Sequence, residues 1–214
     1  MPTVLLIRHG HTDTAGKRLT GWARGIHLNA HGRAQADGLV GRLEGIRVEA
    51  IYSSPLERCR ETAAPLARAR GVAVRLRRPL LEVDYGEWTG RSLSQLRRTK
   101  LWRVVQQAPS AVRFPDGETL LGVQDRAVAE IDRIAQEHPK GIVAVVTHAD
   151  VIRLALAHYA GMHLDQLQRL VVDPASVSVV AVGGGLPRLV KVNDTGDLGS
   201  LVPRRPRTRP QVRG

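Results

Sequence analysis

The chain has 214 residues, 43% of them hydrophobic and 24% charged, with a formal net charge of +12, which predicts one soluble globular domain of ordinary size. The longest apolar run, Ile142 to Val146, is far shorter than the roughly 20 residues that cross a bilayer, and the first residues lack a signal-peptide pattern, so we expect neither a membrane protein nor a secreted one. Cys59 is the only cysteine, which excludes an internal disulfide and favours a cytoplasmic location.

The first eighty residues alternate short apolar runs with segments of helical periodicity. The apolar runs predict buried strands, and polar or proline residues at the segment boundaries predict helix starts. We expect, in chain order, a strand over Thr3–Ile7, a helix from its cap Asn29 to about Leu43, a strand over Val48–Tyr52, a helix started by Ser54 and Pro55 that bends or breaks near Pro65 and stops before Gly71, and a strand over Val72–Leu76.

The second part of the chain continues the same alternation. Its most apolar run is typical of a central parallel strand, and two late apolar runs separated by glycines predict a hairpin or an edge addition. We expect a basic helix over Ser92–Gln107, a loop over Pro109–Gly117, the longest helix over Glu118–Glu137, a strand over Ile142–Thr147, a helix from Asp150 to about Tyr159, and strands over Val177–Val182 and Pro187–Val192.

This order of elements predicts an α/β fold, with a mostly parallel sheet and helices on both faces. We expect a single domain over residues 1–198 and a basic, disordered tail over residues 199–214. Within that tail, residues 203–214 hold five arginines, three prolines and no acidic residue, a composition that cannot build a core. Weak contact with polyanions through the tail is therefore expected, whereas the low aromatic content of 3% argues against a dedicated nucleic-acid-binding domain.

Polar side chains follow several predicted strands at the point where each strand ends. Arg8 and His9 follow the first strand, Glu82 follows the third, and His148 follows the most apolar one, while Arg58 lies in the first turn of the helix after the second strand. In open α/β sheets, ligands bind outside the carboxyl ends of the strands. We therefore expect these five side chains to converge at one rim of the sheet.

Together, these side chains fit the chemistry of phosphoryl transfer. A neutral imidazole such as that of His9 is a good nucleophile toward phosphorus, and Arg8 and Arg58 present planar forks that match phosphate oxygens. His148 can donate a hydrogen bond to the phosphate from another side. Glu82 can protonate the leaving oxygen and then take a proton from water. With this much positive charge, the reaction requires neither a metal ion nor another cofactor.

Each residue taken alone has a plainer interpretation. Arg8-His9-Gly10 is also typical of a solvated strand end with a turn glycine, and His148 is equally consistent with a hydrogen-bonded structural histidine. Asp84 and Glu87 compete with Glu82 for the role of the acid. The prediction therefore depends on the conjunction of these residues.

Five ordered motifs resemble those of a known family. They are LIRHGHT, SSPLERCRETA, LLEVDYGEWTG, FPDGETL and VVTHADVIRLAL. Over residues 3 to about 193, the chain resembles the histidine phosphatase superfamily, also called phosphoglycerate-mutase-like, and the resemblance implies the fold of that family. By motif match, His9 resembles the phosphorylated histidine, Arg8 and Arg58 the phosphate-pocket arginines, His148 the second pocket histidine and Glu82 the proton donor.

The resemblance also implies substrate-binding positions, and it shows departures from the family pattern. Thr12, Thr20, Gly21 and Ala149 are the positions expected to contact the substrate. Ala15 stands where the family often has an asparagine that helps to hold the phosphate, so we expect a different phosphate affinity or pocket shape. The sequence TGW is similar to that of the true mutases but stands one residue nearer to Arg-His-Gly, and LLEVDYGEWTG resembles the phosphatase branch.

These observations predict a metal-independent phosphatase that hydrolyses a small-molecule phosphate monoester through a phosphohistidine at His9. One alternative is a cofactor-dependent phosphoglycerate-type mutase, which returns the phosphoryl group to a sugar acid instead of water. A second alternative is a polyanion-binding protein with a vestigial pocket, suggested by the tail and by Ala15.

Two further features have competing interpretations. His9 and His11, and likewise His27 and His31, are spaced as metal-ligand pairs, but no carboxylate or thiol cluster completes either pair, so we expect no metal site. Residues 91–117, which carry several arginines, are expected to form a lid over the site. A solvated basic helix face is the alternative.

Overall fold

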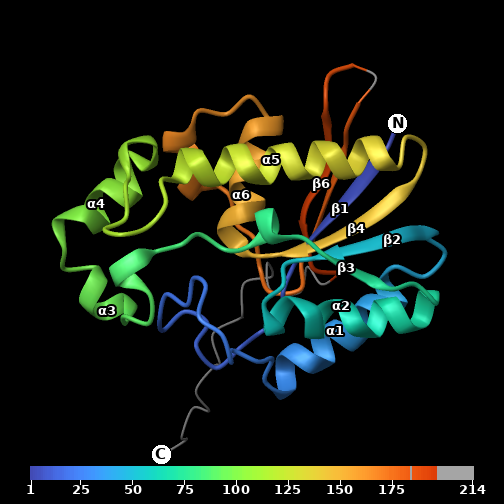
Figure 1. Ribbon diagram of the computed structural model, residues 1–214, viewed down its shortest axis with the longest axis horizontal. Helices are drawn as coiled ribbons and strands as arrows, with labels where there is room; N and C mark the ends of the chain where they lie inside the picture. The colour runs from blue at the N-terminus through green and yellow to red at the C-terminus, as the bar shows by residue number, and fades with distance from the viewer. Residues whose placement is uncertain (184, 197–214) are drawn as a thin grey trace, which may run out of the picture.

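A single six-stranded sheet runs through the part of the chain that the computed structural model describes, residues 1–183 and 185–196 (Figure 1). Its strand order is β3-β2-β4-β1-β5-β6. The first four of these strands are mutually parallel, and β5 and β6 form an antiparallel hairpin at the edge, which confirms the predicted sheet. The strands are β1 (Thr3–Arg8), β2 (Val48–Ser53), β3 (Val74–Leu76), β4 (Ile142–Thr147), β5 (Val177–Ala181) and β6 (Arg188–Asp194).

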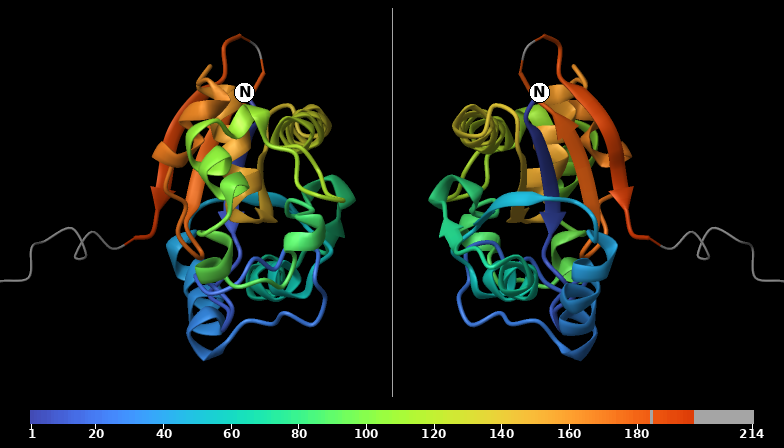
Figure 2. Two further views of the ribbon diagram at one scale, coloured as in Figure 1. Left: turned by 90° about the vertical axis from the view of Figure 1, so that its left-hand side faces the viewer. Right: turned by 90° about the vertical axis from the view of Figure 1, so that its right-hand side faces the viewer.

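Helices cover both faces of the sheet, as predicted (Figure 2). Helices α1 and α2 pack together on one face, and α5 and α6 pack together on the other. The helices are α1 (Ala30–Arg42), α2 (Glu57–Arg70), α3 (Leu93–Leu96), α4 (Lys100–Gln107), α5 (Leu120–Glu137) and α6 (Ala149–Tyr159), with short 3₁₀ turns η1 (Arg78–Leu80), η2 (Gly86–Trp88), η3 (Pro109–Ala111) and η4 (Leu164–Arg169). None of the helices in the described ranges combines the length and apolar character needed to cross a bilayer.

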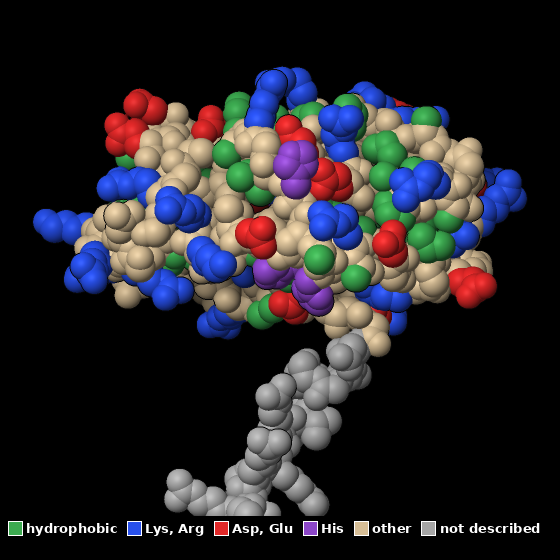
Figure 3. Space-filling view, turned by 90° about the horizontal axis from the view of Figure 1, so that it is seen from below, with side chains coloured by type: hydrophobic (Ala, Val, Ile, Leu, Met, Phe, Trp, Pro, Cys, Tyr) green, Lys and Arg blue, Asp and Glu red, His purple; other side chains and the backbone are tan. Residues whose placement is uncertain are grey.

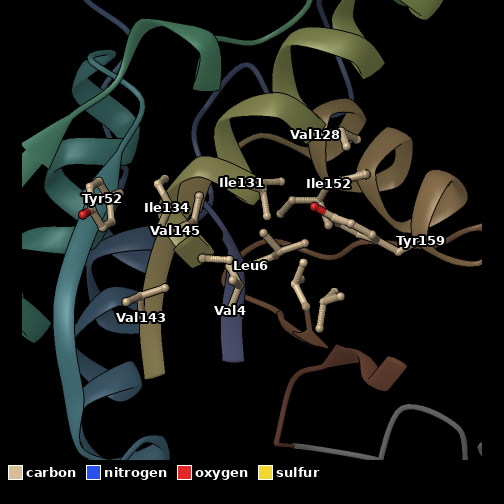
Figure 4. Close-up of a cluster of buried hydrophobic side chains, with 14 of the residues drawn as sticks. Val4, Leu6, Tyr52, Val128, Ile131, Ile134, Val143, Val145, Ile152 and Tyr159 are labelled. Atoms are coloured by element: carbon tan, nitrogen blue, oxygen red, sulfur yellow. The ribbon is translucent and has the colours of Figure 1, made fainter. Parts of the chain in front are cut away.

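The alternating side chains of β1 show how the two helix layers share one sheet. Val4 and Leu6 pack under α5 and α6 (Figure 4), whereas Leu5 and Ile7 pack on the opposite face, in the cluster that includes Leu39 of α1. Because both faces are buried, the strand must be apolar at every position rather than at every second one. The same holds for β4, which explains why these two strands are continuous apolar runs in the sequence.

The expected start of the second helix was wrong by two residues. Helix α2 begins at Glu57, and Leu56 occupies the capping position without a side-chain hydrogen bond, because Ser54 is directed instead to His148. Pro65 lies inside α2, which neither ends nor breaks there. The local cost of proline in a helix is outweighed by burial of the flanking apolar side chains, such as Leu66, against the sheet.

The expected helix over residues 92–107 is two helices. Ser92 caps α3, and Thr99 accepts a hydrogen bond from the backbone of Trp102 and caps α4, so the second cap divides the segment. The sequence does not mark Thr99 as a helix cap, because the helical pattern of apolar residues continues through this position. Helix α5 likewise starts after the cap Thr119 rather than at Glu118.

The tail expected over residues 199–214, and with it the expected domain boundary at residue 198, lies outside the described residues.

Candidate active site

The loop after β1 is held against two other parts of the molecule. The backbone N–H of His9 donates to the carbonyl of Thr147 at the end of β4 (2.9 Å), and the N–H of Gly10 donates to Oγ1 of Thr62 on α2 (2.9 Å). A Cβ atom at Gly10 would lie 2.6 Å from the carbonyl oxygen of Gly32 on α1, which is far inside van der Waals contact. Glycine is therefore required after the histidine because α1 passes directly beside the backbone.

The His9 ring has one nitrogen fixed by the backbone. Its Nδ1 lies 2.8 Å from the carbonyl oxygen of Gly10, and because a carbonyl oxygen only accepts, Nδ1 carries the proton and Nε2 keeps its lone pair. Burial, together with the positive charges of Arg58 and Arg8, lowers the pKa of His9 to about 3. The ring is therefore neutral at physiological pH, with Nε2 available as a nucleophile.

A second histidine lies beside the first. The rings of His9 and His148 are 5.3 Å apart between centroids and are inclined by 65°. His148 is fully buried at the end of β4, where its Nε2 is 2.9 Å from Oγ of Ser54 and 3.4 Å from Sγ of Cys59. Burial and the neighbouring Arg58 lower the pKa of His148 well below its usual value, so its hydrogen bonds orient a neutral ring.

Two arginines, the buried Arg58 and the half-buried Arg8, have free hydrogen-bond donors at this site. Arg58 is only 1% exposed and donates from Nη2 to the carbonyl of Gly21 (2.8 Å), while Arg8 donates from Nη1 to the carbonyl of Val172 (2.7 Å). Within the described residues, Nε of Arg8 and both Nε and Nη1 of Arg58 are buried without a partner. Because unsatisfied buried donors cost about 1–3 kcal/mol each, these atoms indicate a place where an anion binds.

Glu82 is the acid that the structure brings to the site. Its side chain is buried and accepts a hydrogen bond from the backbone N–H of Val83 (3.0 Å). Burial, with the negative charge of Asp150, raises the pKa of Glu82 to about 7, so near neutral pH the carboxyl group can both give and take a proton. Of the two competing acids, Asp84 binds the backbone N–H of Gly86 and Glu87 is exposed; neither lines the cavity described next.

A cavity of about 380 Å³ opens above these groups, and it is lined by Arg8, His9 and Glu82. Of the four expected substrate positions, Thr12, Thr20 and Ala149 line it, as does Ala15. Gly21 is not part of the lining; it acts through the carbonyl that anchors Arg58. A wider depression of about 630 Å³ lies at the opposite end of β1, and its described lining holds no lysine or arginine.

The backbone that carries Glu82 is held by an ion pair that sequence reasoning missed. Arg126 of α5 donates to the carbonyls of Pro79, Leu81 and Glu82 at 2.6, 2.8 and 2.9 Å. The same guanidinium pairs with both carboxylate oxygens of Glu118 at 2.7 and 2.8 Å. Glu118 Oε2 also accepts from the backbone N–H of Asp84 (2.9 Å), and the indole N–H of Trp22 donates to the Glu82 carbonyl (2.6 Å).

Three other missed residues shape the cavity wall. Tyr85 donates from its hydroxyl to Asp150 (2.6 Å), and Arg153 donates from Nη1 to the other carboxylate oxygen of Asp150 (3.2 Å). All three line the cavity. Asp150 and Arg153 lie one helical turn apart in α6, directly after His148, and this i, i+3 spacing is the only signal that could have linked them from the sequence.

Residues 91–117, the expected lid, contribute apolar side chains to the cavity wall. Leu93, Trp102, Val105 and Phe114 line the cavity. The basic side chains of the segment are all exposed and none lines this cavity; they are Arg91, Arg97, Arg98, Lys100, Arg103 and Arg113.

The histidine pairs considered as metal ligands are engaged by protein groups. His27 pairs with Glu61, and Nδ1 of His11 is 2.9 Å from the side-chain amide of Asn29. Among the described residues, no group of three or more His, Cys, Asp or Glu side chains is arranged to hold a metal ion.

Of the five residues predicted to converge, Arg8, His9 and Glu82 line the cavity, whereas Arg58 and His148 are buried outside its lining, with the His148 ring beside that of His9. The site therefore combines a neutral nucleophilic nitrogen, unpartnered guanidinium donors and a buried carboxyl group with a raised pKa. This combination can hold a phosphate group, attack its phosphorus atom and protonate the oxygen that leaves.

Comparison with known proteins gives concordant results. The family model of the histidine phosphatase superfamily (branch 1) matches residues 4–195. Phosphoserine phosphatase 1 of Hydrogenobacter thermophilus is 28% identical over 206 residues, which cover 94% of this chain and 96% of that protein. A bifunctional protein of Mycobacterium tuberculosis is 34% identical over 203 residues, 91% of this chain but 54% of that protein, so the chain spans about half of its length. Among solved structures, Bacillus stearothermophilus YhfR has a TM-score of 0.85 and 29% identity, covering 91% of this chain and 98% of that one.

Proposed function

Because the chain belongs to the histidine phosphatase superfamily (branch 1) and is a phosphatase of that family, we propose that it hydrolyses a small-molecule phosphate monoester through a phosphohistidine at His9. The observation that carries this proposal is the hydrogen bond from Nδ1 of His9 to the carbonyl of Gly10. That bond leaves Nε2 unprotonated, beside arginine donors that have no other partner.

The proposed reaction has two steps. In the first step, Nε2 of His9 attacks phosphorus, the ester P–O bond breaks, and the carboxyl group of Glu82 gives its proton to the leaving oxygen. In the second step, the Glu82 carboxylate takes a proton from water, the water oxygen bonds to phosphorus, and the N–P bond breaks. Arg8, Arg58 and His148 donate hydrogen bonds to the phosphate oxygens, where negative charge accumulates.

A turnover assay on a panel of phosphate esters tests this proposal. Release of alcohol and inorganic phosphate in equal amounts supports a phosphatase. Transfer of the phosphoryl group to an added sugar acid, with no inorganic phosphate released, supports the mutase instead. Absence of turnover with every ester would favour a vestigial pocket that only binds polyanions.

We expect turnover to be unchanged, within about twofold, when the enzyme is treated with excess EDTA, because Arg8 and Arg58 already supply the positive field that phosphoryl transfer needs. The measurement is phosphate release before and after chelation. Loss of activity that a divalent cation restores would contradict the metal-independent mechanism and would return attention to His9 and His11.

We expect kcat/KM to be constant between about pH 4 and pH 6 and to fall as the pH rises through about 7. The pKa of Glu82 is raised to about 7, so its carboxyl group is protonated below this pH and cannot act as an acid above it. The pKa of His9, lowered to about 3, keeps the nucleophile unprotonated throughout. This fall in kcat/KM should be absent in Glu82→Gln. If kcat/KM of that variant still falls near pH 7, the titration of a group other than Glu82 causes it.

Arg126→Met should lower kcat for alkyl phosphates by roughly 10- to 100-fold, because the Glu82 backbone loses its clamp and the acid is no longer held at the leaving oxygen. The loss should be much smaller for an aryl phosphate, whose leaving group needs little protonation. Arg133→Met, on the exposed side of the same helix, is the matched control. Equal losses for both ester classes would show that Arg126 acts only on folding.

We also propose a cytoplasmic location and one catalytic unit over residues 1–198, with residues 91–117 as its lid. The cytoplasmic location is supported by Cys59, the only cysteine of the chain, which is buried as a free thiol. The lid is supported by the four apolar side chains that this segment contributes to the cavity wall.

A further inference from the structure

Beyond the phosphate end, part of the wall of the active-site cavity is apolar. The chain has only seven aromatic residues of the Phe, Trp and Tyr types, and four of them, Tyr85, Trp88, Trp102 and Phe114, line this cavity. Trp88 and Trp102 are stacked, with centroids 6.3 Å apart and planes inclined by 24°. The part of the substrate next to the phosphate therefore meets a surface suited to an apolar or planar group.

A second hollow adjoins the cavity. This hollow, which we call the basic groove, has a volume of about 430 Å³ and is lined by Gly16, Lys17, Arg18, Ser92, Leu93, Ser94 and Arg97. Gly16, Arg18 and Leu93 also line the active-site cavity, so the two hollows share a wall. These three residues are where a ligand that extends beyond the cavity would reach the basic groove.

The two sides of the basic groove are fixed to each other. Arg18 and Ser92 form an isolated antiparallel bridge, and the N–H of Leu93 donates to the carbonyl of Lys17 (2.9 Å). The side chain of Arg18 donates from Nη1 to the carbonyl of Gly90 (2.8 Å). The backbone that carries these cationic side chains is therefore held in place by the protein's own hydrogen bonds and needs no ligand to order it.

The basic groove carries positive charge that no ion pair within the described residues neutralises. Residues 91–113 contain six lysines and arginines and no aspartate or glutamate. Lys17, Arg18 and Arg97 all line the groove and, within the described residues, none of them forms an ion pair. Seen from below, the molecule gathers lysine and arginine side chains over the end where α3 and α4 lie (Figure 3). Such a cluster attracts an anionic group to the mouth of the cavity.

We propose that the substrate is a phosphate monoester whose leaving group has an apolar middle part and a second anionic group at its far end, held in the basic groove by Lys17, Arg18 and Arg97. This inference rests on the proposed function, since it assigns the substrate class to the same site. The apolar part lies along the aromatic wall, and the far anion supplies the counter-charge that the groove lacks.

Matched pairs of linear alkyl phosphates test this proposal. In each pair, one ester ends in a carboxylate and the other in a neutral primary amide of the same length, and the chain grows from two to eight carbons. For esters long enough to reach the groove, the carboxylate should be preferred in kcat/KM by roughly tenfold at low ionic strength. The preference should be absent for the shortest pair and should shrink as salt rises, because exposed charges are screened.

The double variant Lys17→Gln/Arg97→Gln identifies the groove as the source of the preference. It should bring the carboxylate-to-amide ratio in kcat/KM close to one for the long esters, while any fall in kcat/KM for the amides should be the same at every chain length, because every ester carries the same phosphate. Arg188→Gln, at an exposed position on the edge strand β6, is the matched control and should keep the preference.

Two results overturn the proposal: equal kcat/KM for carboxylates and amides at every length, or a preference that the double variant retains. Either result leaves hydrolysis of the amide esters intact, so the phosphatase assignment stands. If no ester of either kind is hydrolysed, the proposed function itself fails.

Discussion

We expect His9→Ala to lose turnover of every phosphate ester, by a factor on the order of 10⁴ or more, because the variant lacks the nucleophile of a two-step mechanism. Among the described residues that line the cavity, His9 is the one histidine, so alanine leaves no imidazole nitrogen there to accept the phosphoryl group. The neighbouring His148 cannot replace it as nucleophile, because its Nε2 is held by Ser54 and Cys59. The measurement is kcat/KM with one alkyl and one aryl phosphate.

The same variant should also lose the covalent intermediate. When the wild-type enzyme is quenched during turnover of a ³²P-labelled ester, we expect label on the protein that is stable in base and labile in acid, as a phosphoramidate is. His31→Ala, a change at an exposed histidine, should keep both label and activity. Label that persists in His9→Ala, or label found on a serine, would refute the assignment of the nucleophile.

The sequence allowed the fold, and the meeting of several candidate site residues at one edge of the sheet, to be predicted for a physical reason. In a sheet buried on both faces, the central strands must be continuous apolar runs, so β1 and β4 could be located within one residue of their bounds. The carboxyl ends of parallel strands meet at one edge, which is why Arg8, His9 and His148 could be expected to meet. Helix starts were less predictable. Ser54, for example, is a residue type that often caps a helix, but its side chain contacts His148 instead.

What could not be predicted are contacts between residues that share no local pattern. Arg126 and Glu118 are eight residues apart at the start of α5, yet their partners are carbonyl and amide groups of residues 79–84. Nothing in the local sequence indicates that a helix arginine will bind the backbone of another loop. The basic groove is a similar case, because Lys17 and Arg97 line one hollow through backbone pairing between residues 17–19 and 90–93, which no local sequence pattern indicates.

Glu82→Gln should divide substrates by their leaving groups. For alkyl phosphates, whose alcohols leave poorly as anions, we expect kcat to fall by roughly 10²- to 10⁴-fold, the usual contribution of a general acid. For 4-nitrophenyl phosphate, whose oxygen leaves with little protonation, the fall in the first step should be much smaller. Glutamine keeps the shape of the side chain but has no carboxyl proton to give, so the difference between the two ester classes measures proton donation itself.

The second step refines this expectation, because hydrolysis of the phosphohistidine also uses Glu82, now as a base toward water. With the aryl ester, Glu82→Gln should therefore form the phosphoenzyme rapidly and turn it over slowly, giving a burst of 4-nitrophenol equal to the enzyme present. Glu87→Gln, a change at an exposed acid five residues away, is the matched control and should behave like the wild type. Equal losses for alkyl and aryl esters, with no burst, would show that Glu82 does not transfer the proton. If Glu82→Gln gives equal losses for both ester classes and Asp84→Asn gives a loss that depends on the leaving group, Asp84 is the acid. Its carboxylate would then have to break its hydrogen bond with the backbone N–H of Gly86 to reach the cavity.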